Sequence, residues 1–211
     1  MNLLNEGYSK KTTFFNKAKG SLVFSKNKKF IDLSCGAGTM LLGHNSKIYK
    51  TSLKKYVNSG LSNFAHPNIS ALNLSKNLKK LYPQFEKFVL CSTGAEANIK
   101  ALRIARAVTN KNLIINVSGS WHGSIDQLLY NANTKNKSYK LSDGIDERLS
   151  KNLKFIPFND INNSKKILNK YLKKISCVLV EPIQGGFPTN EGINYLKFLD
   201  SFCKKNKIIL Y

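Results

Sequence analysis

Apolar and polar positions alternate along the chain in a way that predicts short strands and amphipathic helices in turn. Apolar residues spaced three or four positions apart predict helices over Ile69–Leu81, Ala95–Val108, Ile161–Leu172 and Tyr195–Cys203. Short apolar runs predict strands at Phe88–Cys91, Leu113–Val117, Leu153–Ile156, Cys177–Val180 and Ile208–Leu210. Strands that alternate with helices indicate an α/β fold with a mostly parallel central sheet and crossover helices.

Two stretches do not follow this alternation. Near the N-terminus, apolar runs at Leu22–Phe24 and Phe30–Leu33 flank a lysine turn, which predicts a hairpin followed by a glycine-containing loop. Asn131–Ser150 is polar, rich in lysine and without a clear period. It is therefore predicted to be a long surface loop.

The charge of the chain is strongly positive, with 34 Lys and Arg against 12 Asp and Glu. Such a balance is common in proteins that bind nucleic acids or acidic membranes. Only Arg103, Arg106 and Arg148 are arginines, although arginine is the residue preferred for phosphate and base contacts. The lysines are scattered rather than gathered into one stripe, so we interpret them as a solvated surface and expect no nucleic-acid partner.

The cysteines and the N-terminus indicate the cellular compartment. Cys35, Cys91, Cys177 and Cys203 lie far apart without a CxxC pair, so neither a zinc site nor a disulfide framework is indicated. Met1–Lys11 lacks the apolar stretch of a signal peptide, and no run approaches the roughly 18 apolar residues that span a bilayer. We expect a cytoplasmic protein without a membrane partner or a bound metal.

Three polar motifs follow predicted strands. Ser92–Glu96 precedes a helix, where free N–H groups favour a phosphate, although the same residue types more often form a simple N-cap. In Ser118–Gly123, Trp121 offers a flat face for stacking and His122 is titratable. A core tryptophan and a turn histidine would be equally consistent with that pattern.

The third motif is Val180–Gly186, which places Glu181 and Gln184 after another strand. Taken alone, Glu181 could equally be a structural ion-pair partner. Ligands of open α/β sheets bind beyond the carboxyl ends of the strands, however, and all three motifs are expected at that edge. Their convergence favours a binding site.

These motifs together resemble a known family. The matching segments, in order and spacing, are Phe30–His44, Ser92–Ala97, Ala101–Ala107, Trp121–Gly123 and Val180–Gly185. They resemble the class III pyridoxal-phosphate aminotransferases, and within that family the glutamate-1-semialdehyde 2,1-aminomutase branch. The resemblance implies a fold type I transferase with pyridoxal 5′-phosphate, a small-molecule amino substrate and, for the complete protein, a homodimer. It also implies that residues 1–60 belong to a small domain and residues 61–211 to an incomplete cofactor-binding large domain.

The resemblance assigns roles to individual residues around the cofactor. Thr93, Gly94 and Ala95 match the loop that holds the cofactor phosphate. Trp121 matches the aromatic residue that stacks on the pyridine ring, where the family more often has Tyr or Phe, and His122 follows it in the same motif.

Further assignments concern the phenolic oxygen and the substrate. Gln184 matches the residue that contacts the cofactor's phenolic oxygen, and Glu181 has a supporting role in the same motif. Ser34 lies in the segment that contributes to the substrate pocket, but the adjacent Cys35–Ala37 departs from the aminomutase pattern.

Two expected catalytic groups have no counterpart. In the family, the strand that resembles Ile208–Leu210 leads to an aspartate that pairs with the pyridinium nitrogen, and a later lysine forms the Schiff base. The sequence ends at Tyr211, before both positions, so we expect an inactive N-terminal portion and assign no catalytic residue. The alternatives are another class III transaminase, of the ornithine or amino-sugar type, and a binding module without catalytic activity.

Overall fold

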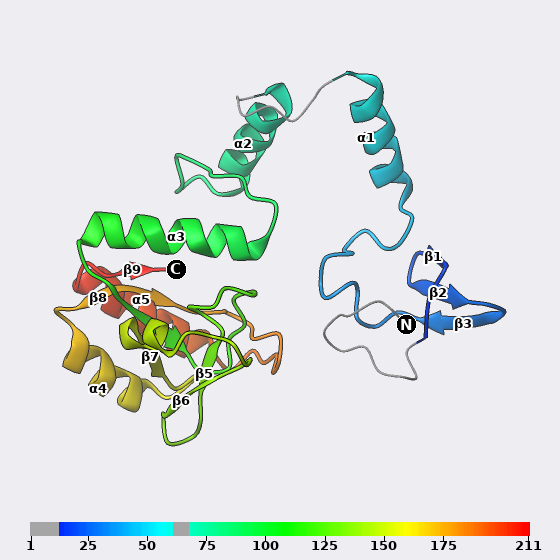
Figure 1. The fold of residues 1–211 in the computed structure, drawn as a ribbon. Helices are drawn as coiled ribbons and strands as arrows, with labels where there is room; N and C mark the ends of the chain where they lie inside the picture. The colour runs from blue at the N-terminus through cyan, green and yellow to red at the C-terminus, as the bar shows by residue number, and fades with distance from the viewer. Residues whose placement is uncertain (1–12, 61–67) are drawn as a thin grey trace. The chain divides into compact units, whose positions relative to one another are not determined.

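The computed structural model describes residues 13–60 and 68–211, and the chain divides into two compact units, Met1–Asn73 and Leu74–Tyr211 (Figure 1). Met1–Lys11 and the start of the second domain predicted at residue 61 lie outside the described residues. Helix α2, Ile69–Leu81, coincides with its predicted range and crosses the limit between the two units.

The first unit contains a three-stranded antiparallel sheet in the order β1-β2-β3. Its strands are β1, Lys17–Lys19, β2, Leu22–Ser25, and β3, Lys28–Ile31. The pairing of β2 with β3 confirms the predicted hairpin. Helix α1, Lys47–Asn58, follows the loop after β3.

The second unit is organised around a parallel sheet in the order β7-β4-β8-β9 (Figure 1). The strands are β4, Leu113–Val117, β7, Leu153–Ile156, β8, Ile175–Leu179, and β9, Ile209–Leu210. Every residue of β4 and β8 is buried, as is typical of central strands covered on both faces. The predicted α/β class and the mostly parallel sheet are therefore confirmed.

Helices cover both faces of this sheet. On one face, α3, Gly94–Thr109, contributes Leu102 and Ala105 to a cluster with Ile114 and Leu179. On the other face pack α4, Ile161–Tyr171, and α5, Ile193–Lys205. Alternate residues of each strand point to opposite faces, so both core clusters draw on the same strands.

Two sequence predictions are wrong. Phe88–Cys91 is not a strand, because no described strand pairs with it, and Val89 is exposed. The predicted loop Asn131–Ser150 contains regular structure, namely the hairpin of β5, Tyr130–Ala132, and β6, Ser138–Lys140, and the start of the 3₁₀ helix η1, Glu147–Asn152. These strands have three residues each and β6 is exposed, so the sequence carries little apolar alternation to reveal them.

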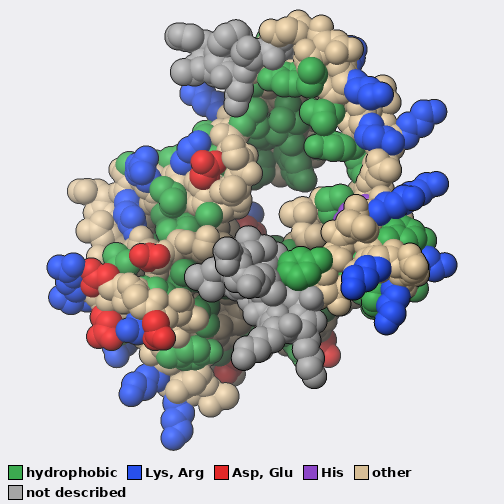
Figure 2. All heavy atoms as spheres, turned by 45° about the vertical axis from the view of Figure 1, so that its right-hand side comes forward, with side chains coloured by type: hydrophobic (Ala, Val, Ile, Leu, Met, Phe, Trp, Pro, Cys, Tyr) green, Lys and Arg blue, Asp and Glu red, His purple; other side chains and the backbone are tan. Residues whose placement is uncertain are grey.

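Basic side chains are spread over the surface, and the cysteines are unpaired thiols. Lys and Arg side chains are dispersed over the face seen in Figure 2, with acidic side chains among them. All four cysteines are free, and burial raises the pKa of Cys177 to about 11 and that of Cys203 to about 12. Across residues 13–60 and 68–211, no helix is long and apolar enough to cross a membrane.

Leu168 of α4 tests the packing of the sheet face that α4 and α5 cover, because its side chain is fully buried there. Leu168→Ala should lower the free energy of unfolding by about 2–5 kcal/mol, since it removes apolar contacts and leaves a cavity. Urea unfolding followed by circular dichroism measures this. Val108→Ala, on the exposed side of α3, should change stability by less than about 0.5 kcal/mol. Equal losses in the two variants would contradict the described core.

Candidate functional site

The first turn of α3 combines a capped helix start with free backbone donors. Thr93 is the N-cap, because its Oγ1 accepts a hydrogen bond from Glu96 N at 3.1 Å, and Glu96 accepts one from Ser92 N at 2.8 Å. The N-cap interpretation of this motif is therefore correct. The N–H groups of Gly94 and Ala95 have no acceptor in the part of the chain that the structure describes, so they are available to an anion.

Trp121 lies on the surface at the end of β4. Its side chain is 58% exposed, so the interpretation as a core tryptophan is wrong. Its backbone N–H donates to Glu181 Oε2 at 3.0 Å, while Glu181 Oε1 accepts from Gly185 N at 2.8 Å. The Glu181 carboxylate is therefore bound by two backbone donors rather than by a cation, and it joins the loops after β4 and β8.

Gln184 provides a second link between these two loops. It is only 5% exposed, and its Nε2 donates to Ser118 O at 2.8 Å and to Ser120 Oγ at 3.3 Å. A Cβ at Gly119, whose φ is +88°, would lie 2.7 Å from Gln184 Oε1. Only glycine therefore permits this close approach of the two loops.

The loop after β4 also packs against the start of α3. A Cβ at Gly123 would lie 3.3 Å from Ala95, and Asn98 Nδ2 donates to His122 O at 2.7 Å. The three polar motifs therefore meet at one edge of the sheet, beside the carboxyl ends of β4 and β8.

His122 forms a polar pair with a strand residue. Its Nε2 lies 2.8 Å from Asn116 Oδ1, and Asn116 is fully buried in β4. Burial lowers the pKa of His122, and the charge of Glu181 opposes this only in part, so the imidazole is neutral at neutral pH. Asn116 Nδ2 has no acceptor among the described residues.

Ser34 belongs to the first unit. Its Oγ donates to Asp32 Oδ1 at 2.6 Å, and His44 Nε2 lies 2.7 Å from Asp32 Oδ2. The hydrogen bonds from Ser34 and His44 lower the pKa of Asp32 to about 2. Asp32 therefore stays ionised and fixes the start of the loop that contains Ser34, whose place in a substrate pocket remains a prediction.

Sequence reasoning missed two buried asparagines of this network, Asn98 and Asn116. Asn98 bonds the loop after β4, and Asn116 bonds His122. Asn98 interrupts an apolar helical pattern and Asn116 interrupts an apolar strand pattern. These interruptions are the sequence feature that could have identified the two residues. A buried polar side chain is rare unless a specific hydrogen bond requires it.

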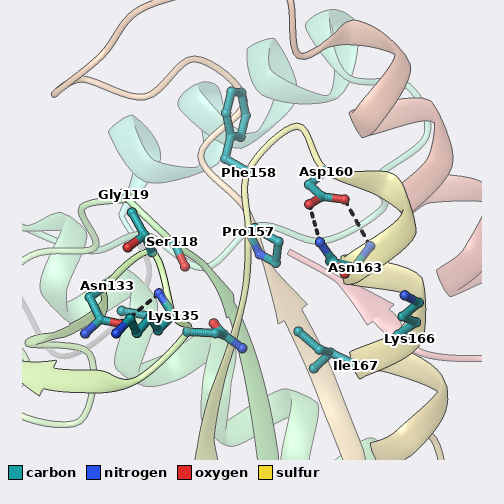
Figure 3. A pocket seen from close by; sticks show the side chains of 13 residues that line it. Ser118, Gly119, Asn133, Lys135, Pro157, Phe158, Asp160, Asn163, Lys166 and Ile167 are labelled. Atoms are coloured by element: carbon teal, nitrogen blue, oxygen red, sulfur yellow. Dashed lines mark hydrogen bonds between the residues drawn. The ribbon is translucent and has the colours of Figure 1, made fainter.

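A cavity of about 620 Å³ lies beside this site, at the carboxyl ends of β4 and β7 (Figure 3). Ser118 and Gly119 line it on one side, and Asp160 and Asn163 at the start of α4 line it on the other. Asp160 caps α4 by accepting from Asn163 N at 3.0 Å. The lining includes none of the residues predicted to contact a cofactor. Among the described residues, no group of three His, Cys, Asp or Glu side chains is placed to hold a metal ion.

Comparisons with known proteins agree on one family. The profile of the family described as aminotransferase class-III matches residues 3–211. Curated relatives named glutamate-1-semialdehyde 2,1-aminomutase, from Thermodesulfovibrio yellowstonii and Wigglesworthia glossinidia brevipalpis, are each 33% identical over 204 residues. These matches cover 93% and 92% of this chain but 47% and 46% of the relatives. The chain thus spans about half the length of the curated relatives it matches.

Solved structures show the same fold. A structure titled as a transaminase with PLP bound superposes with a TM-score of 0.86 at 26% identity, over 96% of this chain and 49% of that one. A glutamate-1-semialdehyde aminomutase from Pseudomonas aeruginosa superposes with a TM-score of 0.79 at 18% identity, over 94% and 44%. The predicted architecture, with its parallel sheet and crossover helices, is therefore confirmed.

The lowered pKa of His122 predicts a specific pH dependence of stability. Because the unfolded chain binds a proton at the usual pKa of 6.5 and the folded chain binds it only at lower pH, stability from this group falls as the pH falls below 6.5. When the pH is lowered from about 7.5 to about 5.5, the melting temperature of His122→Gln should therefore decrease less than that of the unchanged protein. Thermal unfolding followed by circular dichroism measures the difference. Identical pH dependence of both proteins would show that His122 is not buried in its neutral form.

Proposed function

The chain belongs to the class-III aminotransferase family, and we propose that its second unit supplies the phosphate-binding and ring-stacking part of a pyridoxal 5′-phosphate site for amino-group transfer. When bound, this cofactor stabilises negative charge on the carbon next to the substrate nitrogen. The observation that carries the proposal is the meeting of three loops at one sheet edge, joined by Glu181, Gln184 and Asn98.

The residues present fit this group. The free N–H groups of Gly94 and Ala95 suit a phosphate dianion at the start of a helix, and Thr93 Oγ1 keeps its own proton to donate while it accepts from Glu96. A Cβ at Gly94 would meet nothing within 4 Å, so a ligand can approach the backbone closely.

The other two loops supply the ring contacts. The exposed indole of Trp121 offers a face for the pyridine ring, with His122 beside it in the same loop. Gln184 Oε1 has no donor in the described part of the chain, so it is free to accept a hydrogen bond from the cofactor's phenolic O–H. Glu181 supports both loops through backbone N–H groups.

For the substrate, we propose the aminomutase type, in which an amino group moves between neighbouring carbons of one small molecule. The curated relatives at 33% identity support this. We also propose, as the family resemblance implies, that the complete protein acts in the cytoplasm as a homodimer. Ser34 would contact the substrate. The departure at Cys35–Ala37 supports another class-III transaminase as the second candidate.

Gly94→Asp tests the phosphate site without a cost in packing. The first turn of a helix favours an aspartate and a Cβ has room there, so stability should be unchanged or slightly higher. The added charge should weaken binding of pyridoxamine 5′-phosphate by about tenfold or more, because it repels the phosphate at close range. Quenching of Trp121 emission measures binding, since Trp121 is the chain's one tryptophan.

Gly94→Asn is the matched control, because it has the same shape as Gly94→Asp and no charge. Both variants place a side chain beside the phosphate, so Gly94→Asp should bind about tenfold more weakly than Gly94→Asn. Pyridoxamine phosphate is used because it has no aldehyde to react with surface lysines. Equal binding by the Asp and Asn variants would place the phosphate elsewhere, and absence of saturable quenching in the unchanged protein would refute the proposed cofactor site.

A second test concerns the lysines. None of the segments Ser92–Glu96, Ser118–Gly123 and Val180–Gly186 contains a lysine, so we propose that this chain alone provides no Schiff-base residue. Treatment with pyridoxal phosphate and then borohydride should give low labelling spread over many lysines in peptide mass spectrometry. A single lysine labelled in a one-to-one ratio would contradict the proposal.

A further inference from the structure

The backbone of Trp121 and His122 is held at both ends. The N–H of Trp121 donates to Glu181 Oε2 at 3.0 Å, and the carbonyl of His122 accepts from Asn98 Nδ2 at 2.7 Å. One partner comes from the loop after β8 and the other from the second turn of α3. This dipeptide is therefore fixed between the two other loops of the site.

Two hydrogen bonds determine the orientation of the Asn98 side-chain amide. Asn98 is 8% exposed, and its Oδ1 accepts from the hydroxyl of Tyr211 while its Nδ2 donates to His122 O. Exchange of the two amide atoms would place an oxygen against the His122 carbonyl, which is unfavourable. Tyr211 is anchored in turn, because its N donates to Val178 O at 2.8 Å and its O accepts from Val180 N at 2.9 Å.

The indole of Trp121 has little support of its own. It is 58% exposed, and in the described part of the chain it has no aromatic or hydrogen-bonded partner. Gln184 also holds this loop, at Ser118 and Ser120. The Cα–Cβ direction of Trp121 follows from its backbone, which the two hydrogen bonds at Trp121 and His122 help to fix. Only one of these, from Asn98, connects the indole-bearing loop to the helix whose first turn offers Gly94 and Ala95 to a phosphate.

We propose that Asn98 is a positioning residue: it holds the Trp121 stacking face at a fixed place relative to the N-terminus of α3, so that one ligand can contact both. This inference extends the proposed cofactor site and adds a residue that contacts the ligand only through the loop. Asn98 lies in α3 and makes hydrogen bonds both to the loop after β4 and to Tyr211 beside β8, so it connects these three elements.

The test compares Asn98→Leu with Tyr211→Phe in the 211-residue chain. Asn98→Leu removes the bond to His122 O, whereas Tyr211→Phe removes the other bond of Asn98 and leaves that one in place. Without ligand, the steady-state anisotropy of Trp121 emission should fall in Asn98→Leu and stay near the original value in Tyr211→Phe. This readout does not depend on any cofactor.

Ligand binding provides the second readout. Asn98→Leu should weaken pyridoxamine phosphate binding by about threefold to tenfold, as expected for the loss of one buried hydrogen bond, but should change inorganic phosphate binding by less than about twofold. Phosphate binding is followed by calorimetry. A purely structural role would weaken both ligands equally. Asn112→Leu, an exposed asparagine before β4, is the control and should change neither.

The outcomes separate the two proposals. Unchanged anisotropy in a folded Asn98→Leu variant, or equal loss of both ligands, would overturn the positioning role. No binding of pyridoxamine phosphate by the unchanged chain would overturn the cofactor site, while the anisotropy would still decide the role of Asn98. If Asn98→Leu does not fold by circular dichroism, Asn98→Ala replaces it, since alanine removes the same bond without crowding α3.

Discussion

Parallel pairing of β4 with β8 is the constraint on which the candidate site depends. Asn116 pairs with Leu179, so the two neighbouring strands end almost level with each other and their loops begin side by side. Strands that run in parallel must be joined by a crossover, and the crossovers from β7 to β8 and from β8 to β9 place α4 and α5 on one face. Helix α3 leads into β4 and covers the other face. The loops after β4 and β8 and the start of α3 are thereby brought to one edge.

At that edge, polar side chains bind neighbouring loops, whereas backbone N–H groups at the start of α3 remain free among the described residues. Glu181, Gln184 and Asn98 direct polar atoms at backbone groups of neighbouring loops and so fix the loops to one another. The groups left for a ligand are the backbone donors of Gly94 and Ala95 and the exposed face of Trp121. Under the proposed function, loops fixed in this way would bind the cofactor without rearrangement, and the site would be preorganised.

Much of the fold could be predicted from the sequence, because buried strands such as Leu113–Val117 and amphipathic helices such as α3 carry strong periodic patterns. Phe88–Cys91 was mistaken for a strand because an apolar run does not show whether a pairing partner exists. The β5–β6 hairpin was missed because its short strands are mostly polar and its strand pairing, rather than a hydrophobic face, defines it.

The sequence predicts the three loops of the candidate site, but not the hydrogen bonds that join them. Strand-end motifs and the topology rule indicate that the loops meet. The exposure of Trp121 and the bonds of Asn98 depend on distances between residues far apart in the chain, which no local pattern contains. Thr93 shows most clearly why sequence alone does not assign a role to a residue. A helix cap and a phosphate donor require the same residue type at the same position.

The most direct test of the site is a titration of the ¹⁵N-labelled chain with pyridoxamine 5′-phosphate, followed by nuclear magnetic resonance. The largest shifts should occur together, at a common dissociation constant, for the amides of Gly94 and Ala95, the indole N–H of Trp121 and the side-chain amide of Gln184. Shifts confined instead to lysine-rich surfaces at the opposite edge of the sheet, around Lys111 and Lys173, would contradict a cofactor site built from the three loops.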